Sequence, residues 1–214
     1  MNKIIKEQIA QLKPSATLAI NEESNRLKKS GKKVYKFGFG QSPFPVPDSI
    51  TLALKKNVHK NTYLPMQGLE ELRLAISNHL NKNNNNNFKF EDIVIGPGTK
   101  ELMFLTQIIF EGEILLPAPS WVSYQPQALI AKNNVHWIET SSASNWFPTA
   151  ETLEKKIKTL KNKNLMLFLN SPSNPSGAVC KNLKEIAEIA KKYKLIILSD
   201  EIYSLLTFEK KYSS

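Results

Sequence analysis

The chain has 214 residues, of which 41% are hydrophobic and 22% charged, a balance typical of a globular protein. It has no apolar run of the roughly 18–20 residues that a membrane span needs, so no membrane partner is expected; its single cysteine and a start without the apolar stretch of a signal peptide favour a cytoplasmic location. The net charge is +10, but arginines, which most often read bases and phosphates, are rare among the 29 basic residues, so we expect no nucleic-acid partner.

The N-terminal part is predicted to hold helices joined by loops. A first helix is predicted from about Ala16 to Ser30, with Ser15 suited to cap it and Gly31 suited to end it. An extended aromatic segment and a proline-rich loop follow. Pro47 with the next residue then suits the first turn of a second helix.

An amphipathic helix is predicted over residues 69–80. Its apolar side chains fall on one face, and they are Leu69, Leu72, Ile76 and Leu80. The asparagine-rich run at 81–87 lacks the composition of a core and is predicted to be a solvated linker.

From residue 91 onward, short apolar runs alternate with helical patterns. Five strands are predicted, at 92–95, 113–117, 135–139, 165–170 and 194–200. Helices are predicted between them, near 99–110, 121–131, 150–161 and 182–193. This alternation predicts an α/β fold with a mostly parallel sheet and helices on both faces. Ligand-binding residues are therefore expected beyond the carboxyl ends of the strands.

Two of these strand ends carry features that suit a phosphorylated aromatic ligand. Gly98, Thr99 and Lys100 open a helix, where backbone N–H groups bind anions and a glycine lets a phosphate approach closely. Trp121 follows the second strand, where a tryptophan can stack on a flat ligand. Taken alone, each feature is explained as well by a plain turn or by a core aromatic residue.

Two further strand ends add polar groups. Asn174 lies in the rigid, proline-rich sequence NSPSNPSG, and its amide can both donate and accept hydrogen bonds. Asp200 and Tyr203 lie in SDEIY, where a carboxylate after an apolar strand is costly unless a cation meets it. Capping of the following segment is the simpler alternative for the aspartate.

Together, these strand ends suit pyridoxal 5'-phosphate (PLP), a phosphorylated and positively charged heteroaromatic. The PLP phosphate is expected on the turn at 98–100 and the ring against Trp121. The ring oxygen is expected to meet Asn174 and Tyr203, and the ring nitrogen to meet Asp200.

The chain resembles class I aminotransferases of the aspartate aminotransferase superfamily, which are PLP enzymes of fold type I. The matching stretches lie in family order between Lys13 and Tyr203, and they are KPSATLAI, FGFGQSPFPVP, YLPMQGLEELRLAI, IGPGTKEL, LPAPSWVSY, NSPSNPSGAV and SDEIY. The resemblance implies an N-terminal arm and part of a small domain over 1–46, then an incomplete PLP-binding large domain over 47–214.

The resemblance also implies a role for individual residues, and no metal. Cofactor binding is implied for Gly98, Thr99, Lys100, Trp121, Asn174, Asp200, Tyr203 and Tyr63. Substrate binding is implied for Gly40, Trp121 and Asn174, and catalytic roles for Asn174, Asp200 and Tyr203. Tyr63 stands where the family's tyrosine reaches the phosphate of the partner subunit, which implies a homodimer.

The sequence departs from the family pattern in two places. Gln41, Ser42 and Pro43 replace the usual Glu-Pro-Asp, and the sequence ends before the position of the cofactor-bearing lysine. The expected function is amino-group transfer between an amino acid and a 2-oxo acid, by a truncated chain that is inactive alone. The alternatives are a PLP-dependent carbon–sulfur lyase of the same fold and a non-catalytic remnant.

Overall fold

The computed structural model describes residues 4–10, 12, 16–35, 37–38, 40, 42, 44–84 and 86–207. The chain forms two compact units, residues 1–12 with 97–214 and residues 13–96, and each is described by itself. The predicted cap Ser15 lies outside the described residues, and the predicted domain boundary after residue 46 stays a prediction. Within the described part of the chain, no helix is both long and apolar enough to cross a membrane.

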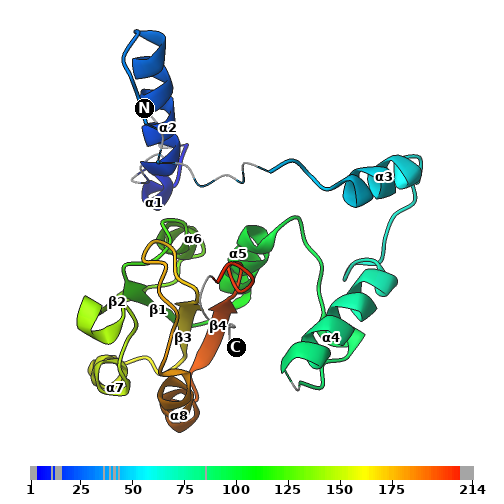
Figure 1. Ribbon diagram of the computed structural model, residues 1–214. Helices are drawn as coiled ribbons and strands as arrows, with labels where there is room; N and C mark the ends of the chain where they lie inside the picture. The colour runs from blue at the N-terminus through cyan, green and yellow to red at the C-terminus, as the bar shows by residue number, and fades with distance from the viewer. Residues whose placement is uncertain are drawn as a thin grey trace. The chain divides into compact units, whose positions relative to one another are not determined.

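The first unit is built on a four-stranded parallel sheet with the strand order β2-β1-β3-β4 (Figure 1). The strands are β1 (Glu113–Ala118), β2 (Val135–Glu139), β3 (Leu165–Asn170) and β4 (Ile196–Asp200). Its helices are α1 (Glu7–Ala10), α5 (Thr99–Ile109), α6 (Tyr124–Ile130), α7 (Ala150–Thr159) and α8 (Leu183–Tyr193), with a 3-10 turn η2 (Ser142–Ser144). Four of the five predicted strands and the helices predicted between them are confirmed.

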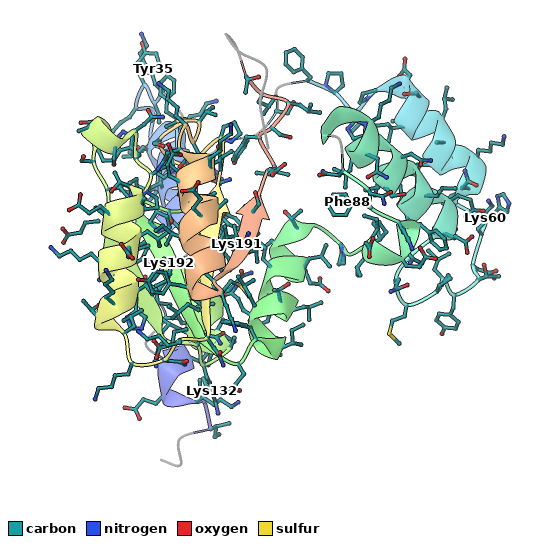
Figure 2. All side chains as sticks on the ribbon, turned by 90° about the horizontal axis from the view of Figure 1, so that it is seen from below. Tyr35, Lys60, Phe88, Lys132, Lys191 and Lys192 are labelled. Atoms are coloured by element: carbon teal, nitrogen blue, oxygen red, sulfur yellow. The ribbon has the colours of Figure 1, made fainter. Side chains whose placement is uncertain are left out.

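Helices α7 and α8 lie side by side and are joined by polar contacts on their outer surface. Glu154 of α7 accepts hydrogen bonds from Lys192 Nζ at 2.8 Å and from the Tyr193 hydroxyl at 2.7 Å. Lys191 and Lys192, which Figure 2 labels, both belong to α8.

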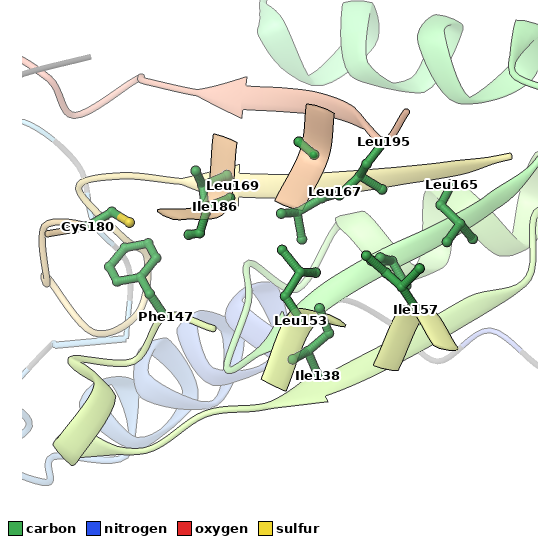
Figure 3. Packing of buried hydrophobic residues seen from close by; sticks show 12 residues of the cluster. Ile138, Phe147, Leu153, Ile157, Leu165, Leu167, Leu169, Cys180, Ile186 and Leu195 are labelled. Atoms are coloured by element: carbon green, nitrogen blue, oxygen red, sulfur yellow. The ribbon is translucent and has the colours of Figure 1, made fainter. Parts of the chain in front are cut away.

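The core of the first unit has two apolar layers, one on each face of the sheet, because successive strand residues point to opposite faces. Leu115 and Leu167 pack with residues of α7 and α8 in the layer shown in Figure 3. Ile114 and Met166 pack with residues of α5 and α6 in the other layer. All six residues of β3 are buried. The predicted helices on both faces are confirmed.

The strand order contains a switch point between β1 and β3. From β1 the chain passes through α6 to β2 on one side, whereas from β3 it passes through α8 to β4 on the other side. Because parallel crossovers are right-handed, α6 and α8 cover opposite faces, as their two core layers show. In open α/β sheets such a point leaves a crevice at the carboxyl ends of the strands.

The predicted strand at 92–95 is wrong. Its first residue, Asp92, belongs to the 3-10 turn η1 (Phe90–Asp92). Residues 93–95 pair with no strand in the described part of the chain. A segment becomes a strand only when its backbone groups join a ladder, and here they bond elsewhere. Ile95 N–H donates to the Gln67 carbonyl at 2.9 Å, and the Ile93 carbonyl accepts from Arg73 Nε at 2.9 Å.

The second unit contains helices α2 (Ala16–Lys29), α3 (Asp48–Asn57) and α4 (Glu70–Asn84). Gly31 follows α2 with φ +82, a backbone conformation that favours glycine after a helix. Pro47 precedes α3 as its N-cap, one position before the expected first turn. The linker prediction for 81–87 is wrong at its start, because α4 runs on to Asn84. The Asn81 side chain then bonds the Phe88 backbone N–H and carbonyl, at 2.7 and 2.8 Å.

The apolar face predicted for α4 is largely open in this unit. Leu69 and Leu72 are exposed, and the buried residues among those described in residues 13–96 are Arg73 and Ser77. Arg73 Nε donates to the carbonyls of Phe90 and Ile93, and its guanidinium lies over the Phe90 ring at 5.2 Å. A buried arginine therefore holds the segment that follows α4.

Candidate functional site

The carboxyl ends of β3 and β4 are tied together by Asn170, a residue that the sequence did not single out. Asn170 pairs in register with Asp200, and its amide donates to the Asp200 carbonyl at 2.9 Å. Its side-chain oxygen accepts from the Asn174 N–H at 2.7 Å. Asn170 therefore fixes the loop that carries Asn174 against the end of β4. Only its position as the last, buried residue of β3 could have signalled this.

Two of the predicted site residues meet beyond these strands. Asn174 Nδ2 donates to the Tyr203 hydroxyl at 3.4 Å, although the two residues come from different loops. Ser173 N–H donates to the Ala178 carbonyl at 2.9 Å, which closes the loop around Asn174. The glycine of this loop, Gly177, has φ +70, so the turn depends on a residue without a side chain.

Asp200 is the buried acid of this region, with 9% of its surface exposed. Its Oδ2 accepts from the Tyr124 hydroxyl at 2.6 Å, and its Oδ1 accepts from the Ile202 N–H at 3.3 Å. Among the residues that the structure describes, no lysine, arginine or histidine forms an ion pair with it. A buried carboxylate met only by neutral donors suits a cationic ligand group, such as a protonated ring nitrogen.

Trp121 and Tyr124 bring aromatic rings to the same place. The Trp121 ring meets the Tyr124 ring edge-on, with centroids 5.5 Å apart, and Tyr124 also packs on Phe168 at 5.0 Å. Burial, followed by the hydrogen bond and charge of Asp200, raises the pKa of Tyr124. No role was predicted for Tyr124. Its spacing of three from Trp121 was the available signal, because a single turn brings residues three apart together, and here the Tyr124 N–H donates to the Trp121 carbonyl at 3.2 Å.

The predicted phosphate turn begins α5. Gly98 is the N-cap, with φ +99, and a Cβ built on it would meet no atom within 4 Å, so the backbone there is accessible. The Lys100 carbonyl accepts from Gln127 Nε2 at 2.9 Å, which ties the turn to α6. Lys100 Nζ lies 5.5 Å from the centroid of the Trp121 ring. The free N–H groups of a helix start suit a phosphate group.

The remaining predicted residues lie in the second unit. Tyr63 is fully exposed and Gly40 is exposed, so both are accessible to a ligand or a partner. Their roles, like those of the other site residues, stay predictions. The described residues contain no cluster of three histidine, cysteine or acidic side chains that could hold a metal ion.

A parallel sheet with a switch point defines an α/β protein of the kind in which ligands bind at the carboxyl ends of the strands. Residues 32–214 match the family model for aminotransferase class I and II. The chain therefore belongs to the class I and II aminotransferase family, whose members are generally PLP-dependent.

Relatives and solved structures agree with this family. The chain is 32% identical to a probable aspartate/prephenate aminotransferase of Rickettsia typhi, over 96% of the chain and 53% of that relative. It is 34% identical to an aspartate aminotransferase of Bacillus sp. strain YM-2, over 97% of the chain and 54% of the relative. The aspartate aminotransferase of Thermus thermophilus with maleate matches with TM-score 0.88 and 29% identity, over 98% of the chain and 56% of that protein. The chain thus spans about half the length of the relatives it matches.

Proposed function

We propose that this chain forms the PLP-binding half of an aminotransferase that moves an amino group between an amino acid and a 2-oxo acid. The observation that carries the proposal is the buried Asp200, which has a phenol and a backbone N–H as donors and is next to the loop of Asn174. Family membership and the aminotransferase names of the relatives support the same activity. Some relatives are named for aspartate, so aspartate is the first amino donor to test.

Each part of the candidate site would bind a different part of PLP. The backbone at Gly98, Thr99 and Lys100 would bind the phosphate, and Trp121 would cover one face of the ring. Asn174 and Tyr203, already joined by a hydrogen bond, would together hold the ring oxygen.

Asp200 would keep the ring nitrogen protonated, because a buried anion favours a neighbouring cation. PLP, when bound, supplies an electron-withdrawing ring that makes the proton on the substrate's α-carbon easier to remove. Asp200 sustains that property for as long as its own carboxylate stays ionised and faces the ring nitrogen. Gly40 would contact the substrate carboxylate.

The test compares the protein with its Asp200→Asn variant, which keeps the side chain's size and removes its charge. With added PLP, aspartate and a 2-oxo acid, new amino acid is measured by chromatography, and PLP binding is measured by absorbance. In a protein that has the full length of the matched relatives, we expect PLP-dependent amino transfer, reduced about 100-fold or more in the variant. Glu201→Gln is the matched control, since it neutralises the adjacent carboxylate, which accepts instead from Ser199 at 2.9 Å.

Other outcomes would support the alternatives. Release of a thiol and a 2-oxo acid from a cysteine conjugate, without amino transfer, would identify a carbon–sulfur lyase. If Asp200→Asn leaves PLP binding unchanged, the assignment of Asp200 is wrong. If the unaltered chain binds no PLP at all, the result supports the alternative that the chain is a non-catalytic remnant.

We also propose a cytoplasmic homodimer in which Tyr63 of one subunit reaches the PLP phosphate of the other. The exposed position of Tyr63 supports this, because a hydroxyl must be accessible to act across an interface. Sedimentation should show a dimer, and Tyr63→Phe should weaken PLP binding by about tenfold without changing the mass. A monomer that binds PLP equally well with and without the Tyr63 hydroxyl would contradict this arrangement.

A further inference from the structure

A buried phenol and a buried carboxylate form one contact in the first unit. Tyr124 is 1% exposed, and its hydroxyl donates to Asp200 Oδ2 at 2.6 Å, while Ile202 N–H donates to Oδ1 at 3.3 Å. Each carboxylate oxygen thus has its own donor, and two donors from different directions set the carboxylate plane. We propose, resting on the proposed function, that Tyr124 is a positioning residue that holds the Asp200 carboxylate toward the PLP ring nitrogen.

The Tyr124 ring is itself fixed by protein contacts. It begins α6, meets Trp121 edge-on at 5.5 Å and packs on Phe168 at 5.0 Å within an apolar layer of the core. Because a phenol O–H lies close to the plane of its ring, a ring packed in this way restricts the directions in which the hydroxyl can donate, and it donates to Asp200. Preorganised donors of this kind stabilise a charge without a cost of reorganisation at the moment of reaction.

The protonation state of Tyr124 suits a permanent donor. Burial is the largest cause that raises its pKa, and the hydrogen bond and charge of Asp200 raise it further. Asp200 and Tyr203 are the titratable groups that act on this phenol, while Lys100 faces the ring of Trp121. The phenol therefore keeps its proton, and Asp200 keeps a donor across the neutral and mildly alkaline range.

The first test needs no cofactor. Tyr124→Phe keeps the packed ring and removes only the hydroxyl, so the carboxylate is left with Ile202 N–H as its donor. We expect the Ile202 amide of residues 1–214 to exchange its hydrogen about tenfold faster in this variant, because its acceptor is no longer held. Tyr193→Phe is the matched control, since it removes another phenol that donates to a carboxylate, at 2.7 Å on the outer surface.

The second test follows the absorbance of added PLP with pH. In Tyr124→Phe we expect PLP to bind about tenfold more weakly, and its ring nitrogen to lose its proton at lower pH than in the unaltered chain. Tyr193→Phe should leave both properties unchanged. The melting temperature of each variant, measured in parallel, shows whether a change in binding follows from lost folding.

The two tests separate the positioning role from the proposed function. Unchanged Ile202 exchange in Tyr124→Phe would overturn the positioning role whatever PLP does. Faster exchange with an unchanged PLP pH profile would also overturn it, because the oriented carboxylate would not serve the ring nitrogen. If Asp200→Asn also leaves PLP binding unaltered, the role of Asp200 fails with it, whereas an unaltered chain that binds no PLP would overturn the proposed function itself.

Discussion

The two units of this chain differ in whether they bury apolar side chains. The first unit buries two apolar layers around strands β1 and β3, each strand contributing to both faces. Among the described residues of the second unit, the buried ones are Arg73 and Ser77, while apolar residues such as Leu72 and Leu74 are exposed. The sheet unit thus carries its own hydrophobic stabilisation, whereas the other unit is held by polar contacts and keeps apolar surface available for contact.

The largest effect should come from the core of the first unit. Leu167 is fully buried in β3, so Leu167→Ala should lower the free energy of unfolding by about 2–5 kcal/mol. Denaturant unfolding followed by tryptophan fluorescence reports this unit alone, because all three tryptophans, at 121, 137 and 146, lie in it. Leu72→Ala, on the exposed face of α4, should change this free energy of unfolding by no more than about 0.5 kcal/mol. Equal effects of the two substitutions would remove the contrast between the units.

A smaller and local effect is expected at Arg73 in the second unit. Arg73→Met keeps an apolar stem but removes the donor to the Phe90 and Ile93 carbonyls. The Phe90 carbonyl still accepts from the Ile93 N–H at 3.1 Å, whereas the partly buried Ile93 carbonyl loses this donor, and an unpaired buried acceptor costs about 1–3 kcal/mol. Hydrogen exchange at the Ile95 amide, which bonds to Gln67, should therefore become faster by about tenfold or more. The fluorescence midpoint of the first unit should not move.

The other arginine of the chain provides the control for this local effect. Arg26 is exposed on α2 and pairs with Glu23 one turn away, so Arg26→Met should leave Ile95 exchange unchanged. If Arg73→Met instead lowers the tryptophan midpoint as much as Leu167→Ala, the two units unfold as one and their contrast has no energetic meaning.

The same contrast explains what the sequence could predict. Continuous apolar runs and helical periods are local signals, and they predicted β1 to β4 and the helices between them. The strand at 92–95 was wrong because a strand also needs a neighbour, which no local pattern supplies. The buried Arg73 could not be predicted either, since its spacing puts it on the face of Leu69 and Ile76 but arginine is a residue type that is almost never fully buried.

The candidate site divides in the same way. Asn174 and Tyr203 were both predicted for one ligand atom, and the structure joins them by a hydrogen bond. Tyr124 and Asn170 were missed as partners of Asp200. They lie 76 and 30 positions away from it in the sequence, so these contacts exist only once the sheet has folded. Motifs identify residues that face a ligand, whereas the residues that hold them become visible only in the structure.

The smallest expected effect lies on the outer surface of the first unit, where polar contacts add to an apolar core. Hydrogen bonds from Lys192 and Tyr193, with the nearby Lys158 at 3.4 Å, lower the pKa of Glu154 from 4.5 to about 2. Since the Glu154 carboxyl binds its proton more weakly in the folded state than in the unfolded state, the contacts of its ionised form stabilise the fold above pH 4.5. Its contribution is lost as the pH falls from 4.5 toward about 2.

Glu154→Gln therefore should melt slightly below the unaltered chain near neutral pH, and this difference should disappear as the solution is acidified through that range. Melting temperatures of both proteins across the pH series measure it, and Glu188→Gln on the exposed side of α8 serves as the control. Exposed ion pairs contribute little because water screens them. A difference that persists undiminished at the acidic end would show that Glu154 acts through packing rather than through its charge. A loss as large as that of Leu167→Ala would mean that the surface, and not the apolar core, decides the stability of the sheet unit.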